Sequence, residues 1–139
     1  MKKDCVFCRI VGKELPSHLV YEDDKVSAFL DINPVSLGHT LIVPKEHYAD
    51  LLQTPDEVAG HMMMVAKKIS HSLEETVGAD GFNLGLNNGE TAGQVVDHLH
   101  LHVMPRFKND GLKLWPGKQV DPENLEKIAK RMRSFIRKD

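Results

Sequence analysis

The stretch "DHLHLHVMPRF", from Asp97 to Phe107, alternates imidazole and apolar side chains. Its histidines are two residues apart with an apolar residue in each gap: His98, Leu99, His100, Leu101, His102 and Val103. Successive side chains of a β-strand point to opposite faces of the sheet. The stretch therefore predicts a strand that lines one face with three imidazoles and packs its other face against a core.

Three histidines in a row suit either a metal ion or phosphate chemistry. The rise of a strand puts His98 and His102 roughly 13 Å apart, whereas metal–imidazole bonds are about 2 Å long. An adjacent pair could share an ion, but all three could do so only with strain. Neutral imidazole is a good nucleophile toward phosphorus, and its pKa of about 6.5 leaves it largely unprotonated at neutral pH. We therefore favour a row that holds and attacks a phosphate over a solvated sheet face or a catalytic ion.

The rest of the chain alternates strand-like and helix-like patterns. A period of two or a β-branched apolar run indicates strands at residues 19–24, 25–31, 39–44, 82–88 and 98–105. Apolar residues at spacings of three and four predict a long helix after Thr54 and a second helix at about 122–137. This order predicts an α+β fold: an antiparallel, meander-like sheet of about five strands, with the long helix packed on it and a C-terminal helix.

Capping signals place the ends of both helices. Thr54 is a suitable N-cap for the long helix, Glu57 completes a capping box, and Gly78 ends the helix. Asp121 is the expected N-cap of the C-terminal helix, because Pro122 suits its first turn.

Size and composition predict a single domain over residues 1–139 with no membrane partner. Hydrophobic residues make up 41% and charged residues 27% of the chain, and the formal net charge is −2. This charge gives no reason to expect a nucleic-acid partner, and no apolar run is long enough to cross a membrane. The start of the chain has no secretory pattern, so we expect a cytoplasmic protein. Cys5 and Cys8 should then be thiols or metal ligands rather than a disulfide.

Several motifs resemble those of the histidine triad (HIT) family of nucleotide hydrolases and transferases. "HLHLHVM" matches the pattern His-x-His-x-His-x-x with apolar x, and supporting pieces are "AFLDINP" (28–34), "GHTLIVPKEH" (38–47), "LNNGETAGQ" (86–94) and "LWPG" (114–117). The resemblance covers residues of about 5–115, is closest to the bacterial nucleotide-binding (Hint-like) branch, and leaves the C-terminal helix outside.

The resemblance implies a set of catalytic residues. They are His98, His100, His102 and His39. His100 matches the nucleophile, which would attack the α-phosphorus of a nucleoside monophosphate derivative and form a covalent nucleotidyl-histidine intermediate. His102 would contact the phosphate oxygens and the departing group. The implied enzyme is a nucleoside phosphoramidase that acts on adenosine phosphoramidates or aminoacyl adenylates.

The resemblance also implies the binding residues for an AMP-like purine nucleotide. Asp31 matches the residue that accepts hydrogen bonds from the ribose hydroxyls, and Asn87 and Gln94 match residues on the phosphate side. The apolar slot around the base would be formed by Phe7, Ile10, Phe29 and Ile32. Taken without the family, these four would be core residues, Asn87 a turn residue and His39 a structural histidine.

Cys5-x-x-Cys8 is half of a zinc site, and the pattern alone is weak. Some bacterial members of the HIT family, which this sequence resembles, hold a structural zinc ion with four ligands. These are such a cysteine pair, the last residue of "PKEH" and the first histidine of the triad. Those two residues are His47 and His98 here. The resemblance thus implies a structural zinc ion on Cys5, Cys8, His47 and His98 that takes no part in the chemistry.

The sequence departs from the family in ways that leave the substrate open. Val95 replaces a hydroxyl residue that contacts the phosphate or leaving group in relatives, and "VMPR" after the triad is also found in the branch that cleaves dinucleoside polyphosphates. Histidine rather than glutamine at position 102 favours hydrolysis over transfer. The alternatives are a dinucleoside polyphosphate hydrolase and a nucleotide-binding regulatory protein with incidental turnover. The resemblance also implies a homodimer.

Overall fold

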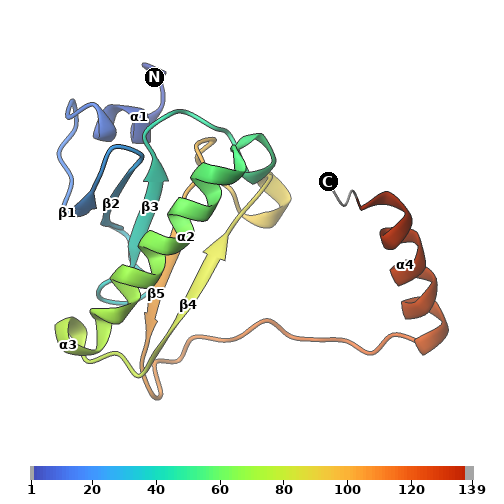
Figure 1. Cartoon of the computed structure of the whole chain (residues 1–139). Coiled ribbons are helices and arrows are strands. Elements are labelled where there is room, and N and C mark those ends of the chain that lie inside the picture. Colours follow the sequence, from blue (N-terminus) through green and yellow to red (C-terminus); the bar gives the residue numbers. More distant parts are fainter. Residues whose placement is uncertain (1, 137–139) are drawn as a thin grey trace.

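Five antiparallel strands form the central sheet of the computed structural model, which describes residues 2–136 (Figure 1). The strands are β1 (Leu19–Glu22), β2 (Val26–Leu30), β3 (Thr40–Pro44), β4 (Gly81–Leu86) and β5 (Leu101–Arg106). Their order across the sheet is β1-β2-β3-β5-β4, so the first three strands form a meander and β5 lies between β3 and β4. The predicted α+β class and antiparallel sheet are confirmed.

The long helix α2 (Asp56–His71) covers one face of this sheet. Its buried side chains pack on inward-facing residues of three strands and form the main core: Met62, Val65, Ala66 and Ile69 against Val26, Ala28, Ile42, Leu101 and Val103. Helical residues at spacings of three and four share a face, which is why this set is buried. The site therefore lies on the opposite face of the sheet.

The predicted ends of the long helix were partly wrong. The helix is interrupted at Ser72 and continues as α3 (Leu73–Val77), which Gly78 ends with a φ of 70°. Its N-cap is Pro55 and has no side-chain cap bond. Thr54 instead ends a 3-10 turn, η1 (Leu51–Gln53), and donates to the Asp50 carbonyl.

A short helix, α1 (Val6–Val11), covers part of the other sheet face, and the sequence patterns did not predict it. Six residues are too few for a helical period to be recognised. Its residues join a second core cluster whose buried members are Cys5, Phe7, Cys8, Phe29, Leu41 and Val43. Neighbouring residues of β3 therefore alternate between the two clusters, with Ile42 in one and Leu41 and Val43 in the other.

The predicted strand of three histidines is shorter than expected. β5 begins at Leu101, so only His102 lies within it, and His98 and His100 belong to the segment that leads into it. A second 3-10 turn, η2 (Glu90–Ala92), precedes this segment. The backbone N–H of Leu99 donates to the Tyr48 carbonyl instead of a strand partner. The chain bends in this segment before β5, and the bend allows the side chain of His98 to point away from those of His100 and His102.

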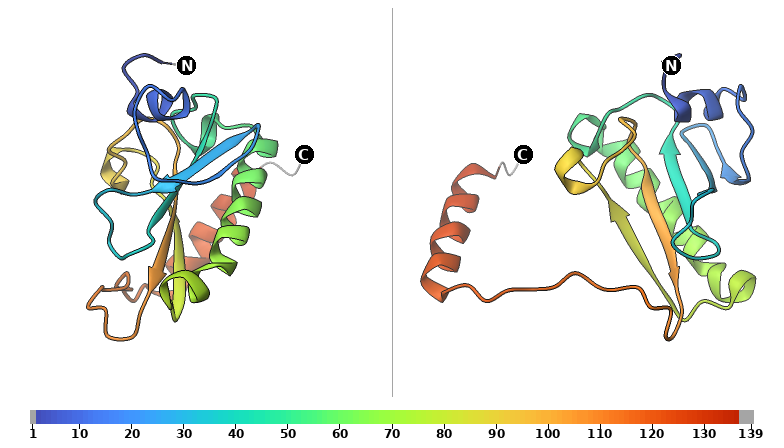
Figure 2. Two further views of the ribbon diagram at one scale, coloured as in Figure 1. Left: turned by 90° about the vertical axis from the view of Figure 1, so that its left-hand side faces the viewer. Right: turned by 180° about the vertical axis from the view of Figure 1, so that it is seen from behind.

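The C-terminal helix α4 (Pro122–Phe135) stands apart from the rest of the molecule, joined by an extended linker (Figures 1 and 2). Asp121 occupies the predicted N-cap position with Pro122 after it, but its side chain makes no cap bond. Ile136 is extended, and position 137, the predicted end of the helix, lies outside the described residues. Within residues 2–136, no helix is both long enough and apolar enough to cross a bilayer.

Candidate active site and metal centre

His100 and His102 lie side by side on the sheet face opposite α2. Their ring centroids are 4.9 Å apart, and the Phe7 ring of α1 lies 5.0 Å from the His100 ring. In the sheet, His102 pairs with Leu41 of β3 and Gly85 of β4. Of the three predicted imidazoles, His100 and His102 therefore lie together as a pair, and the apolar Phe7 ring flanks this pair.

The hydrogen bond of His100 defines which of its nitrogens is free. Nδ1 of His100 lies 2.8 Å from the carbonyl oxygen of His98. A carbonyl only accepts, so Nδ1 carries the proton and donates it. The neutral ring then has its lone pair on Nε2. His100 thus has the tautomer that a nucleophile attacking through Nε2 requires.

A chain of bonds defines the protonation of His39 and His102 in the same way. The backbone N–H of Val35 donates to Nδ1 of His39 over 3.1 Å, so the neutral His39 ring carries its proton on Nε2. That proton is donated to Nδ1 of His102 over 2.9 Å. His102 is left with an N–H at Nε2, a buried atom with no protein partner in the described chain. A donor in this position can bind a phosphate oxygen.

Gly38 allows His39 to reach this position. Its φ is +99°, and a Cβ there would lie 3.2 Å from Cγ of Pro105 and 3.3 Å from Cγ1 of Val77. A side chain at position 38 would meet both the conformational and the steric penalty. The chain therefore needs glycine immediately before the histidine that orients His102.

Asp31 is close to this chain of histidines but keeps a free oxygen. Its Oδ1 accepts from the backbone N–H of Asn33 over 2.9 Å, whereas Oδ2 lies 3.7 Å from Nε2 of His39. That distance is too long for a hydrogen bond. Oδ2 can therefore accept from a ligand, as the predicted ribose contact requires.

Burial keeps His39 and His102 neutral at neutral pH. It lowers the pKa of His102 to about 4, and the neighbouring His100 and His39 rings act in the same direction. Burial also lowers the pKa of His39, although the Asp31 carboxylate opposes the shift. The tautomers of His39 and His102 were assigned for neutral rings, and the lowered pKa values of both residues are consistent with neutral rings.

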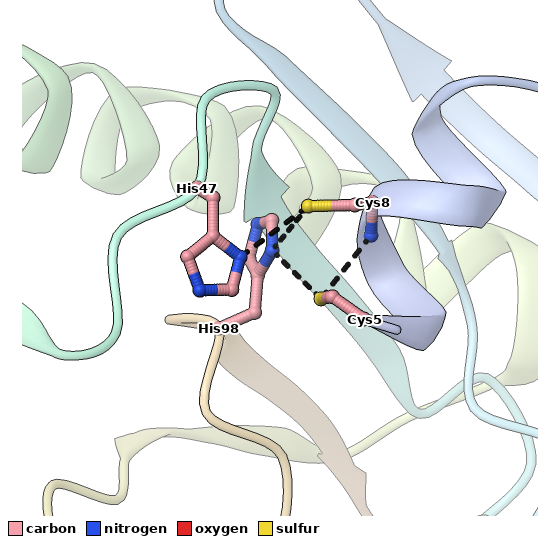
Figure 3. Close-up of side chains that lie close together, drawn as sticks. All are labelled: Cys5, Cys8, His47 and His98. Carbon is pink, nitrogen blue, oxygen red and sulfur yellow. Dashed lines mark hydrogen bonds between the residues drawn. The ribbon is translucent and has the colours of Figure 1, made fainter. Parts of the chain in front are cut away.

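The ring of His98 lies beside Cys5, Cys8 and His47 (Figure 3). Its Nε2–H donates to the Pro44 carbonyl over 2.8 Å, which leaves the lone pair on Nδ1. This Nδ1 lies 3.3 Å from Sγ of Cys5 and 3.5 Å from Sγ of Cys8, and Nδ1 of His47 lies 3.3 Å from Sγ of Cys8. The four predicted zinc ligands are thus brought together.

The Cys5, Cys8, His47 and His98 cluster has the donor set of a closed tetrahedral site. Its four ligand atoms all lie within 4.8 Å of one another, and two thiolates with two imidazoles are a common set for structural zinc. Burial lowers the pKa of His98 to about 4, and it raises the pKa of the Cys5 thiol. The bond from His98 to the Pro44 carbonyl is the kind of outer contact that orients a metal-binding histidine.

A second group, formed by Asp31, His39 and His102, also has three ligand-type atoms within 4.8 Å of one another. Its hydrogen bonds oppose a metal ion. Nδ1 of His39 accepts from Val35 and Nε2 carries the proton, so the ring has no lone pair to offer. This group is better described as a hydrogen-bonded relay.

The predicted base-binding residues do not all meet. Phe7 and Phe29 are buried in edge-to-face contact, with ring centroids 5.7 Å apart, and Ile10 packs against the same cluster. Ile32 is 80% exposed and lies outside this cluster. Three of the four residues therefore form one apolar wall beside His100, and Ile32 could close over a base only from outside.

Asn87 and Gln94 both belong to the loop between β4 and β5. Nδ2 of Asn87 donates to the Gly93 carbonyl over 3.5 Å, a weak bond that leaves this side chain largely free. Gln94 is buried, and its amide donates to the carbonyls of Ala49 and Val96 while its Oε1 accepts from Gly89 N–H. With both amide hydrogens used, Gln94 orders the loop and could donate to a phosphate only if one bond broke.

The cleft beside His102 was not predicted from the sequence. It has a volume of about 520 Å³, and its lining includes His39, Asn87 and His102 together with Leu112, Lys113, Leu114 and Trp115. Trp115 is 94% exposed. Trp115 belongs to the motif "LWPG", but no local pattern places a segment after β5 next to residues of β4.

Comparison with known proteins gives one consistent result. The HIT domain family matches residues 12–109. An adenylylsulfatase of Arabidopsis thaliana is 41% identical over 99% of this chain and 70% of its own, and an adenosine 5'-monophosphoramidase of Candida albicans is 36% identical over 96% and 92%.

Solved structures agree with this match. The crystal structure of a HIT family protein from Bacillus anthracis aligns over 99% of this chain and 100% of its own, with 40% identity and a TM-score of 0.89. A zinc-bound histidine triad family protein from Mycobacterium smegmatis aligns over 94% and 96%, with 39% identity and a TM-score of 0.75.

The lowered pKa of His102 predicts a loss of stability in mild acid. Between about pH 6.5 and 4 the unfolded chain binds a proton at His102 and the folded chain does not, so the free energy of unfolding falls as the pH falls. From pH 7 to 5 this contributes up to about 2 kcal/mol. Urea unfolding at both pH values should show a smaller loss in His102→Gln than in the native chain. His71→Gln, at an exposed position, should behave like the native chain, and equal losses in all three proteins would contradict the assignment.

Proposed function

The chain belongs to the HIT family, and from this membership and the geometry of its histidines we propose that it is a nucleotide hydrolase acting through His100. The substrate class is a purine nucleoside monophosphate derivative, such as an adenosine phosphoramidate or an aminoacyl adenylate. The observation that carries the proposal is the bond from Nδ1 of His100 to the His98 carbonyl, which leaves Nε2 free to attack.

The reaction proceeds in two displacements at phosphorus. Nε2 of His100 forms a bond to the α-phosphorus while the bond to the leaving group breaks, and water then releases the nucleoside monophosphate from the histidine. The ring gains positive charge when it is phosphorylated, and the carbonyl of His98 stabilises that charge through the Nδ1 proton. The Nε2–H of His102 donates a hydrogen bond to a phosphate oxygen, and a fixed donor of this kind stabilises the transition state.

The surrounding residues position the nucleotide. Oδ2 of Asp31 accepts from the ribose hydroxyls, since Oδ1 is already occupied by Asn33. The Phe7 and Phe29 wall contacts the base, and the cleft lined by Trp115 receives the leaving group. An apolar wall has few base-edge contacts, so discrimination among purines should be weak. The names of two relatives, an adenylylsulfatase and a monophosphoramidase, support substrates with an adenylyl group.

We also propose that zinc occupies the Cys5, Cys8, His47 and His98 cluster as a structural ion. Four closely spaced ligand atoms and a zinc-bound relative support this. The metal would tie the amino terminus to the segment before β5 and hold His98 in place. Thiolate ligands persist in a reducing compartment, which supports a cytoplasmic location.

A homodimer completes the proposal. β4 is an outer strand of the sheet, carries no charged residue from Gly81 to Leu86, and exposes Phe82 and Leu84. Uncharged outer strands tend to pair with another chain. Pairing of β4 with the β4 of a second copy would cover them.

Replacement of His100 by alanine tests the proposed chemistry. We expect turnover to fall by at least about 10⁴-fold, with no nucleotidyl adduct detected by mass spectrometry of acid-quenched reactions. His71→Ala, on the outer side of α2, should keep native rates and form the adduct. The substrate panel should contain adenosine phosphoramidate, an aminoacyl adenylate and diadenosine polyphosphates. An active His100→Ala protein would disprove the role of His100.

The zinc proposal is tested by metal content and stability. The native protein should retain about one equivalent of zinc after dialysis, and a free concentration of zinc 100 times its Kd should stabilise the fold by about 2.7 kcal/mol. Cys8→Ser should lose both effects, whereas Ser72→Ala, away from the cluster, should keep them. Full zinc retention by Cys8→Ser would rule out this ligand set.

A further inference from the structure

The apolar stripe of α4 is uncovered in the single chain. Leu125, Ile128, Met132 and Phe135 are between 53% and 76% exposed, and no residue of α4 is buried. Figures 1 and 2 show the helix well away from the sheet. A helix of this length is marginal in water unless its apolar side packs on something. The stripe therefore requires a surface that the same chain does not provide in this structure.

Hydrogen bonds of Arg106 and Asp110 order the start of the segment that leads to α4. We name residues 107–136 the arm. The Arg106 guanidinium donates to both carboxylate oxygens of Asp110, to Oδ1 of Asn83 in β4 and to the Leu112 carbonyl. Asp110 also accepts from the backbone N–H groups of Phe107 and Leu112. These bonds fix the direction in which the arm leaves the domain.

The arm leaves on the side of β4, the strand proposed above to pair with a second copy. In Figure 1 and in the right-hand view of Figure 2, α4 lies beyond β4, on the side away from β1. The 15 residues before α4 can span up to roughly 50 Å when extended, and a five-stranded sheet is roughly 24 Å wide. The arm is thus long enough to cross a second domain placed against β4.

Charge favours the same occupant. Helix α4 carries four basic and two acidic side chains, whereas residues 1–107 carry nine basic and 15 acidic side chains. The Bacillus anthracis structure aligns over 99% of the chain with a TM-score of 0.89, so the alignment includes the arm. We propose that α4 docks through its apolar stripe on the domain of a second copy, which returns its own α4 to the first. This inference rests on the homodimer proposed above.

Docking of α4 also bears on the active site. Leu112, Leu114 and Trp115, at the start of the arm, line the cleft that contains His39 and His102. Trp115 is almost fully exposed in the single chain, so little within the chain holds it. An arm fixed at Arg106 and anchored again by α4 on the partner keeps this wall in place. The exchange therefore positions the leaving-group side of the cleft.

Photo-crosslinking of the full chain tests the exchange. Phe135 is replaced by p-benzoylphenylalanine in one preparation and Ser134, on the opposite side of α4, in a matched control. Each is mixed with an excess of unmodified chain that carries a longer tag, and equilibrated before irradiation. Position 135 should give a product that joins the two chain lengths, with crosslinked peptides from residues 2–107, at least about five times more abundant than from position 134.

Crosslinks only within one chain, equal yields at both positions, or a dimer in light scattering without a crosslink from position 135 would each overturn the exchange. Hydrolysis is assayed on the same samples. An active protein without the crosslink would disprove the exchange of α4 and leave the proposed function intact. A crosslinked but inactive protein would disprove the proposed function and leave the exchange intact. Ile128→Asp should abolish the crosslink from position 135, while Lys130→Asp on the polar side should retain at least half of it.

Discussion

The hydrogen bond from Nδ1 of His100 to the carbonyl of His98 is the interaction on which the site depends. It places the ring proton on one nitrogen and the lone pair on the other, and it fixes the direction in which that lone pair points. The same residue that accepts this bond is anchored by its own ring to Pro44 and to the cysteine cluster. One residue, His98, therefore joins the proposed metal centre to the proposed nucleophile.

The hydrogen bonds that link Val35, His39 and His102 give His39 and His102 separate roles. Backbone N–H of Val35 sets the tautomer of His39, and His39 in turn sets that of His102. Burial favours the neutral form of His39 and His102, so these two adjacent imidazoles avoid mutual repulsion. The result is one free lone pair on His100 beside one free N–H on His102, which is the pairing that attack on a phosphate requires.

Sequence patterns predicted the parts of this protein that depend on periodicity and on motif spacing. The antiparallel sheet and the long helix appear in the structure, and so does the cluster of Cys5, Cys8, His47 and His98 that the family resemblance implied. Patterns failed where tertiary contacts decide. The bend that turns His98 out of the row depends on Tyr48 and Pro44, far away in sequence, and the bonds of buried Gln94 depend on Ala49. The cleft wall at Trp115 likewise depends on how Arg106 holds the arm.

Long-range ¹H–¹⁵N spectra of the imidazole rings test these tautomers, because they report which nitrogen of each neutral ring carries the proton. At neutral pH we expect a proton on Nδ1 of His100 and on Nε2 of His39, His98 and His102, with assignments made by single replacements. A His100 ring that carries its proton on Nε2 would have no lone pair facing the substrate, and that result would contradict the mechanism.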